Sequence, residues 1–309
     1  MPNLPYSNFF LSNEVEDQYN SLLDLQRFVK VDNGLVGAPG MVRKINVYSA
    51  TDSVEKVALG VGNTLTTEAG YVQKEYEIAT AQGRFAYYDE EAMADPFMVV
   101  VGTRHLGVDM FNTVNGDVYA EWLTAPMVIC PSNIDFDAFA DACAMLNVEN
   151  LEGLQINAFV CAADIAALRK SLKGTLQYVE AFARQGYVGT VAGVNIYTKK
   201  DATAGTIIVA TNTAVTIFNK KGVEVETPAR STDEANIRQN WVYARKYYVT
   251  ALTDETKAVQ MLVGATATLT ADATVQVGTD YYKKEGVGYV KVTPVGTENP
   301  ASEGWYEIA

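Results

Sequence analysis

The sequence of 309 residues contains a single histidine, His105, and this scarcity leaves one candidate for any histidine-dependent catalysis. A Ser–His–Asp or Cys–His site would have to use His105, and no GxSxG nucleophile elbow accompanies it. The sequence also lacks an HExxH helix, an EF-hand loop and a CxxC pair, and its stretch GVGNTLTTEAG lacks the GK[ST] ending of a phosphate-binding loop. The sequence therefore predicts no catalytic residue, no metal site and no cofactor.

Cysteine is also rare, with only Cys130, Cys143 and Cys161. They are odd in number, lack CxxC spacing and sit among apolar residues, so we expect small buried side chains in a reducing compartment. No apolar run reaches the ~18 residues that span a bilayer. The start, MPNLPYSNFF, has no basic region followed by an apolar core. We therefore expect a chain that stays in the cytoplasm of the cell that makes it, without a membrane partner.

Positive charge is scarce as well: 24 Lys and Arg residues face 37 Asp and Glu residues, for a net charge of −13. Proteins that grip nucleic acid rely on clustered cations at the phosphates, so this balance argues against such a role. It still allows a protein that lies beside nucleic acid without holding it. Hydrophobic residues make up 48% of the chain and charged residues 20%, as is typical of a folded protein. The length of 309 residues suggests two or three domains.

One long helix, from Asp89 to Trp122, is the element around which the other predicted elements are organised. Asp89 is the expected N-cap, and Glu90 and Glu91 place negative charge in the first turn. Pro96 sits early, where either its missing N–H costs little or the helix bends slightly. The expected buried face has apolar residues at helical spacing: Phe97, Val101, Val108, Phe111, Val114, Val118 and Trp122. Three interior glycines each cost roughly 1 kcal/mol against Ala and indicate strong packing or close backbone approach: Gly102, Gly107 and Gly116.

The segments before this helix predict an arm and a hairpin. A helix is expected from Asn13 to about Val29, followed by the Gly- and Pro-rich linker VDNGLVGAPG. Residues 43–88 alternate as two long strands, KINVYSAT and a second strand that begins near Tyr71, around a polar tip. Two such strands without a large apolar face make a poor isolated hairpin, so the hairpin needs an outside partner.

The segments after the helix predict an α/β region, more strands and a small β unit. IDFDAFADACAMLN is an expected helix with Phe136, Phe139, Ala140 and Cys143 on one side, and buried strands and a second helix follow. STDEANIRQNWVYARKYYVTALTDETKAVQML predicts long alternating β segments, with Ile237 in the first. Residues 264–309 predict three or four strands, near the lower size limit for independent folding.

Three stretches are informative through their order. GRFAYYDEEAMADPFMVVVGTRHLGVDMFNTVNGDVYAEW joins the hairpin to the long helix. CAADIAALRKSL and YVEAFARQGYVGTVAGVNIYTKK give a helix, a Gly-bracketed hairpin and a strand, and ANIRQNWVYARKYYVTALTDETKAVQML runs an Arg-rich strand into a Tyr-rich one. In this order, over roughly residues 1–263, they resemble the major capsid proteins of tailed bacteriophages, whose fold is shared with encapsulins and the floor of the herpesvirus shell.

The resemblance implies an α+β fold with an N-terminal arm, an extended β-hairpin loop, a long spine helix, and peripheral and axial domains. A small C-terminal β module is added to this pattern. The implied division is 1–42 for the arm, 43–88 for the loop, 89–125 for the spine helix of the peripheral domain, 126–218 for the axial α/β domain, 219–263 for the return through the peripheral domain and 264–309 for the module.

The resemblance also implies a function and partners. It implies hexamers and pentamers that close an icosahedral shell around double-stranded DNA, assembled in the host cytoplasm and found in the virion. Only about 40 residues precede the loop, so we expect a separate scaffolding protein or none. The resemblance also implies a portal protein, and the net charge implies DNA that is not held through its phosphates. Five arginines are candidates for ion pairs between subunits, or else solvated surface residues: Arg84, Arg104, Arg230, Arg238 and Arg245.

Two alternatives remain open at this stage. The first is an encapsulin-type compartment that encloses an enzyme instead of a genome. The second is a sugar-binding or adhesive surface module in residues 264–309, whose aromatic residues either stack on sugars or form a β core: Tyr281, Tyr282, Tyr289, Trp305 and Tyr306.

Overall fold

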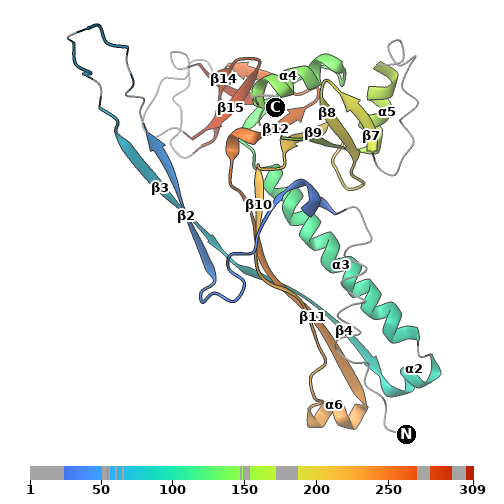
Figure 1. Cartoon of the computed structure of the whole chain (residues 1–309). Coiled ribbons are helices and arrows are strands. Elements are labelled where there is room, and N and C mark those ends of the chain that lie inside the picture. Colours follow the sequence, from blue (N-terminus) through green and yellow to red (C-terminus); the bar gives the residue numbers. More distant parts are fainter. Residues whose placement is uncertain are drawn as a thin grey trace.

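A computed structural model describes residues 24–50, 54, 56–59, 61–64, 66–95, 97–146, 148, 154–171, 187–269, 279–293 and 304–309. Its described strands form a four-stranded sheet, a ten-stranded sheet and a two-stranded hairpin, and one long helix connects the first two (Figure 1). The α+β architecture expected from the sequence is confirmed.

The long helix lies along the narrow four-stranded sheet. The helix is α3 (Phe97–Trp122), and the strand order is β1 (Lys30–Asp32), β10 (Val215–Glu226), β11 (Gln239–Leu252), β4 (Ala79–Tyr88). β11 is antiparallel to β10 and β4, whereas β1 is parallel to β10. Residues of β11 alternate between buried and half-buried over most of its length, because one face packs against α3 and the other does not.

The ten-stranded sheet has helices on one face and the end of α3 on the other. Its order is β13 (Ala267–Leu269), β16 (Trp305–Ile308), β14 (Tyr281–Glu285), β15 (Gly288–Val292), β5 (Met127–Ile129), β12 (Ala258–Leu262), β9 (Thr206–Thr211), β6 (Ile156–Val160), β8 (Val194–Thr198), β7 (Tyr187–Val191). The helices are α4 (Phe136–Leu146) and α5 (Ala162–Ser171), whose apolar residues share a core with this sheet. On the opposite face Trp122 of α3 stacks on Phe159 of β6, with ring centroids 4.6 Å apart.

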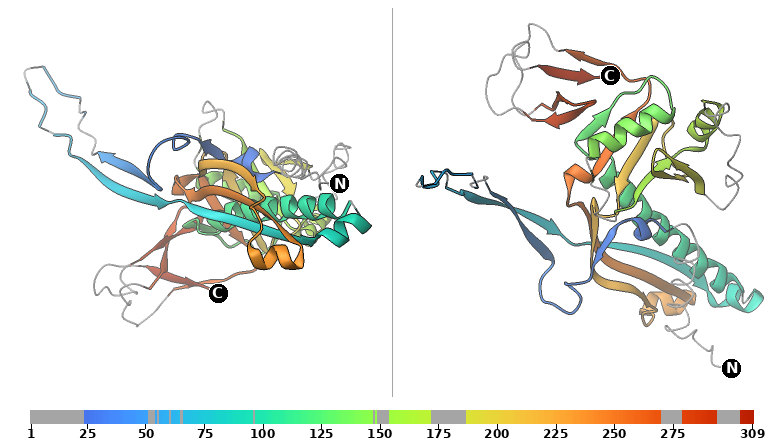
Figure 2. Two further views of the ribbon diagram at one scale, coloured as in Figure 1. Left: turned by 90° about the horizontal axis from the view of Figure 1, so that it is seen from below. Right: turned by 45° about the horizontal axis from the view of Figure 1, so that its top comes forward.

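The hairpin projects away from both sheets (Figures 1 and 2). It consists of β2 (Val42–Ala50) and β3 (Ala69–Glu77), paired in register from Val42↔Glu77 to Ala50↔Ala69. The remaining short elements are the 3₁₀ helices η1 (Leu25–Phe28) and η4 (Glu255–Lys257) and the α-helices α2 (Asp89–Ala94) and α6 (Thr232–Ile237).

The expected single helix over residues 89–122 is wrong, because the structure divides it into α2 and α3. Asp95 between them is extended, with φ −138° and ψ 96°, and its carboxylate accepts a hydrogen bond from the N–H of Phe97 at 3.0 Å. The expected cap is wrong too: Tyr88 is the N-cap, and Asp89 is the first helical residue. Pro96 lies outside the described residues.

The buried face of α3 also differs from the expectation. Val108 is only half-buried, and Phe97 and Val101 are 74% and 56% exposed, whereas Phe111, Val114, Val118 and Trp122 are buried as expected. Polar residues join the buried face because their side chains bond to backbone: the Thr103 hydroxyl donates to the Val99 carbonyl at 2.7 Å, and the Asn115 side chain accepts from the Leu25 N–H at 3.1 Å.

Four further expectations need correction. The second hairpin strand is two strands, because the chain leaves the hairpin at buried Ile78 and β4 pairs with β11 instead. The expected strand around Ile237 begins as helix α6, since Ser231 and Glu234 form a reciprocal capping box. In α4, Phe136 is exposed and Ala138, Phe139, Ala142 and Leu146 are buried. The expected helix 13–29 is represented by η1 followed by β1, and its residues 13–23 lie outside the described part.

Two glycines of α3 have opposite surroundings, which gives a matched pair of substitutions. A Cβ on Gly102 would overlap the ring of Phe85 in β4, whereas a Cβ on Gly116 would meet open space. We expect Gly102→Ala to destabilise the isolated folded chain by roughly 1–3 kcal/mol through overpacking. Gly116→Ala should stabilise it by about 1 kcal/mol through helix propensity. Urea unfolding followed by circular dichroism measures both, and equal effects of the two substitutions would contradict the packing assigned to Gly102.

Candidate assembly surfaces

The arginines predicted as subunit contacts lie mainly at the end of the four-stranded sheet farthest from the ten-stranded one. The Arg230 guanidinium forms an ion pair with Asp89 at the start of α2, and its Nε donates to the Asn240 side chain at 2.9 Å. Asn240 in turn donates to Asp89 at 2.8 Å. The hydrogen bond from Arg230 holds the pKa of the Asp89 carboxyl below its usual range. This cluster ties α2, β11 and the loop before α6 together.

The other four arginines lie on exposed or half-buried surfaces. Arg84 stacks over the Trp241 ring at 5.1 Å, and Arg245 bonds to Gln82 at 2.9 Å and to Glu226 at 2.6 Å. Arg238 ends α6 with φ 58° and pairs with Glu90 at 2.7 Å. Arg104 lies on the exposed face of α3. Arg84, Arg238 and Arg245 thus contact their own chain, as Arg230 does, and a role of any of the five arginines between subunits stays a prediction.

Replacing Asp89 should be costly, because its neighbours lose an acceptor in a largely buried place. We expect Asp89→Ala to destabilise the unassembled subunit by roughly 1–3 kcal/mol. The control Arg238→Ala breaks an exposed pair and should cost less than about 1 kcal/mol. Because the folded-state pKa of Asp89 is lowered, its contribution is present above the pKa of the unfolded chain and disappears as the pH falls through the folded-state value. Denaturant unfolding at pH 7 and in acid should therefore show a difference between wild type and Asp89→Ala that shrinks in acid.

The root of the hairpin is fastened to the body by side chains from distant parts of the chain. Lys74 of β3 pairs with Glu255 at 2.6 Å, and the Tyr76 ring stacks on Phe218 of β10 at 5.6 Å. Arg43 of β2 pairs with Asp32 of β1 at 3.2 Å. The hairpin thus leaves the body in a defined direction.

Beyond its root the hairpin presents apolar side chains without cover. Val54 is 94% exposed and Leu59 is fully exposed, and along the strands Val47, Tyr71 and Val72 are exposed as well. In water such side chains gain free energy when another surface covers them. The outer part of the hairpin is therefore a candidate contact surface.

A second uncovered apolar patch lies at the opposite end of the molecule. Met93 of α2 and Phe97 and Val101 of α3 are all more than half exposed. We call these three residues the helix-end patch. Because α2 and the first turns of α3 lie far from the ten-stranded sheet, this patch receives no cover from it (Figure 1).

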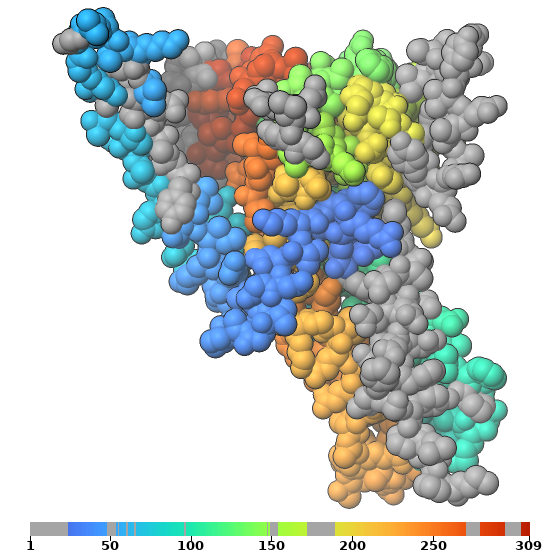
Figure 3. All heavy atoms as spheres, in the orientation of Figure 1, coloured from blue at the N-terminus to red at the C-terminus, as the bar shows by residue number. Residues whose placement is uncertain are grey.

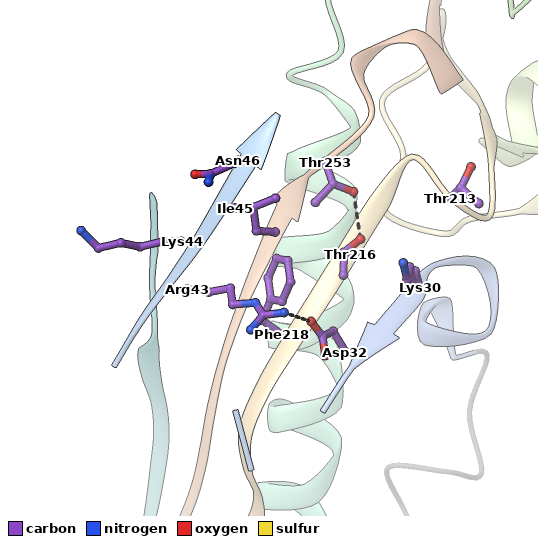
Figure 4. Close-up of a pocket in the computed structure, with 10 residues that line it drawn as sticks. All are labelled: Lys30, Asp32, Arg43, Lys44, Ile45, Asn46, Thr213, Thr216, Phe218 and Thr253. Atoms are coloured by element: carbon purple, nitrogen blue, oxygen red, sulfur yellow. Dashed lines mark hydrogen bonds and ion pairs between the residues drawn. The ribbon is translucent and has the colours of Figure 1, made fainter. Parts of the chain in front are cut away.

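A pocket of about 520 Å³ opens where the hairpin meets the body. Its ten lining residues come from β1, β2, β10 and their neighbours and are Lys30, Asp32, Arg43, Lys44, Ile45, Asn46, Thr213, Thr216, Phe218 and Thr253. Figure 4 shows Ile45 and Phe218 facing each other between the strands, with the Thr216–Thr253 hydroxyl pair (2.9 Å) above and the Arg43–Asp32 pair below. In the space-filling view, the segment containing η1, β1 and the root of β2 lies across this face (Figure 3).

The seam between α3 and its sheet contains a buried lysine, Lys246 of β11, which is 4% exposed. Its ammonium lies 5.3 Å from the Tyr248 ring centre, and the Tyr248 hydroxyl donates to Asp117 of α3 at 2.5 Å. Burial lowers the pKa of Lys246 to about 8, although the negative charge of Asp24 acts in the opposite direction. The folded subunit therefore disfavours the charged form.

This buried lysine predicts an alkaline gain in stability. Below pH 8 the folded state bears the full penalty of the buried charge, and the penalty is relieved as the pH rises towards the unfolded value of 10.5. Between pH 8 and 9.5 we expect the free energy of unfolding of the unassembled subunit to rise by on the order of 1–2 kcal/mol. Lys246→Met should remove this rise, whereas the control Lys44→Met, at an exposed site, should keep it. Equal pH slopes in both variants would contradict the assignment.

No clear reaction centre is present in the part of the chain that the structure describes. No group of three or more His, Cys, Asp and Glu residues there is arranged to hold a metal ion. His105 is exposed on α3. The three cysteines are free, but only Cys161 is fully buried and the other two are half-buried. None of the described helices combines the length and the apolar character needed to cross a membrane.

Comparisons with known proteins show that this chain is similar to capsid proteins. No protein-family model matches the chain. Among curated proteins, the major capsid protein of Staphylococcus phage phiMR11 is 23% identical over 257 residues, which cover 81% of this chain and 91% of the relative.

Solved structures of capsids share the fold. The mature capsid of bacteriophage PhiM1 aligns with a TM-score of 0.59 at 9% identity, covering 78% of this chain and 87% of that one. The virus-like particle of Pyrococcus furiosus aligns with a TM-score of 0.57 at 12% identity, covering 81% and 97%. At these identities the structural likeness establishes the fold alone.

Proposed function

We propose that this chain, which has the fold of tailed-bacteriophage major capsid proteins, is a major capsid protein that assembles as hexamers and pentamers into an icosahedral shell around double-stranded DNA. The observation that carries the proposal is the projecting hairpin β2–β3, which leaves the body with apolar side chains uncovered. The phiMR11 relative, itself named a major capsid protein, supports it over four-fifths of the chain.

The hairpin has the properties of an inter-subunit clamp. A two-stranded hairpin is marginally stable in water by itself, so its outer half gains stability when it lies on another subunit. The helix-end patch is an apolar surface of the kind that such a neighbour would cover. Each contact is small, and repetition by symmetry makes the closed shell stable.

The structure suggests how the parts divide this work. We assign α3 and the four-stranded sheet to a peripheral unit, the ten-stranded sheet from β5 to β7 with α4 and α5 to an axial unit, and β13–β16 to the C-terminal module. The five arginines stay candidate contacts between subunits. A separate scaffolding protein and a portal protein are the partners we expect for closure and packaging.

The net charge of −13 fits a shell that lies beside DNA without gripping it. We infer a structural role in the virion and no enzymatic activity of the chain itself.

Electron microscopy of the purified chain tests the proposal directly. The full chain, alone and with its scaffolding protein, should form hexamers, sheets or closed shells. A chain that stays monomeric under all of these conditions would overturn the proposal. Nuclease-protected DNA inside particles purified from infected cells supports the genome shell, whereas an enclosed enzyme without DNA would favour an encapsulin-type compartment.

A further inference from the structure

The C-terminal module has two chemically different sheet faces. On one face Tyr281 of β14 and Trp305 of β16 are buried and meet edge to face, with ring centroids 6.0 Å apart. The Lys283 ammonium lies 4.2 Å from the Trp305 ring centre on the same face. These two aromatic residues form the core of the module and are unavailable to a ligand.

The opposite face has a row of three tyrosines. Tyr282 of β14 lies directly opposite Tyr306 of β16, and Lys284 of β14 lies opposite Tyr289 of β15. Directly opposed residues share a sheet face, and so do residues two apart on one strand, so all four side chains lie on the same side. Lys291, opposite Tyr282, joins them. We call Tyr282, Tyr289 and Tyr306 the tyrosine face.

The tyrosine face points away from the cores that hold the module in place. Val290, which follows Tyr289 and so points the other way, packs on the core beneath α4. None of the three tyrosines belongs to a hydrophobic cluster of the described residues, and all three are half-buried. The rings of Tyr289 and Tyr306 meet edge to face at 5.2 Å, which fixes their orientation across three adjacent strands.

The charge around these rings discriminates between ligands that stack on aromatic groups. Nucleobases stack on such platforms only where cations hold the phosphates. Here Lys291 is neutralised by Asp280 at 2.6 Å, and residues 264–309 contain three lysines against six Asp and Glu residues. Polyanions are therefore repelled by the module as by the whole chain. A pyranose ring offers an apolar face to a phenol ring and hydroxyls to its polar groups without requiring net charge.

We infer that the tyrosine face is a binding site for neutral sugar chains. Tyr282, Tyr289 and Tyr306 stack on successive pyranose rings, while Lys284 and the Lys291–Asp280 pair hydrogen-bond sugar hydroxyls at the edge. A single face binds weakly, and a particle that displays many copies retains a polysaccharide through multivalency. Because the site lies within one subunit, sugar binding can be absent while the proposed shell function holds, and shell assembly can be absent while sugar binding holds.

The test uses the full chain, as particles or as unassembled subunits, on a printed array of neutral gluco-, galacto-, manno- and N-acetylglucosamine oligosaccharides. Alginate and a 20-nucleotide oligo(dT) are the polyanion probes. The variants are Tyr282→Ala alone, which leaves the Tyr289–Tyr306 ring contact in place, and the triple alanine variant of the tyrosine face. The control is Tyr71→Ala, an exposed tyrosine on the hairpin.

The expected result is retention on at least one neutral sugar, lowered about tenfold or more by the triple variant and partly by Tyr282→Ala, with Tyr71→Ala unchanged. Thermal unfolding tests whether each variant is folded. If the triple variant does not fold, the sugar binding of Tyr282→Ala alone tests the inference. Absence of retention on every neutral sugar, retention only on alginate or oligo(dT), or equal binding by wild type and Tyr282→Ala would overturn the inference. Loss of shell assembly in Tyr282→Ala would overturn it too, by making this face a subunit contact.

Discussion

Shells should fail to form when residues 51–68 are replaced by the two-residue turn Asn-Gly, although the subunit still folds. Ala50 and Ala69 are directly paired, so a two-residue turn closes the shortened hairpin in the same register. The replacement removes Val54 and Leu59, which are almost fully exposed in the isolated subunit and lie outside its buried core. Each Val or Leu that a neighbour buries in the shell is worth about 1.5–3 kcal/mol. Loss of several at every repeated contact should abolish closure.

Electron microscopy and sedimentation of particles measure assembly, and thermal unfolding of the unassembled subunit measures folding. A graded variant keeps the tip length but changes Val54, Val57 and Leu59 to Ser, and it should assemble poorly for the same reason. Val287→Thr, at an exposed turn of the C-terminal module, is the control and should assemble normally. Normal shells from the shortened hairpin would mean that its tip is not an inter-subunit clamp.

The hairpin illustrates what sequence periodicity predicts and where it stops. Alternation in KINVYSAT predicted β2, and the polar stretch after it predicted the tip. The same alternation continues through Ile78 into β4, so nothing local marks the point where the chain changes partner. That point is set by the burial of Ile78 and by its N–H, which donates to the Met41 carbonyl at 2.7 Å. Pairing partners distant in sequence decide it.

The candidate contact arginines also show that local sequence patterns do not predict partners that are distant in the sequence. Their sequence positions predicted charged surface residues, and Arg238 and Arg104 are indeed exposed. The partners of Arg230 and Arg245 come from strands and helices up to 163 residues away, as in the bond from Arg245 to Gln82. Local patterns carry no information on such pairs. By contrast, the capping box of Ser231 and Glu234 is a local signal that could have revealed α6.

The aromatic residues of the C-terminal module lie on two opposite faces of its sheet, and composition alone did not predict which residue lies on which face. The sequence indicated four strands or three, and the structure describes four. Strand alternation then separates Tyr281 and Trp305, which form a core, from the three residues of the tyrosine face. Only the cross-strand register, fixed by turns and packing, assigns each ring to its side.

Gly288→Val should release the C-terminal module from the body. Gly288 begins β15, and a Cβ there would lie 2.8 Å from the backbone carbonyl oxygen of Val128 and 3.1 Å from the Met145 sulfur. The backbone of β5 cannot yield as a side-chain end can, so the β15–β5 pairing that joins the module to the larger sheet should open. Among the described residues of the module, Tyr281 and Trp305 form a small core with Val292 packed against it, and a unit of about 45 residues lies near the lower size limit for independent folding. Limited proteolysis should therefore remove residues 264–309 at least about tenfold faster than in wild type, a rate ratio that corresponds to about 1.4 kcal/mol of opening free energy.

The control is Val287→Thr, at the adjacent exposed position, which should keep the wild-type rate of cleavage. If Gly288→Val leaves the cleavage rate unchanged, the module is held by contacts other than this strand pair.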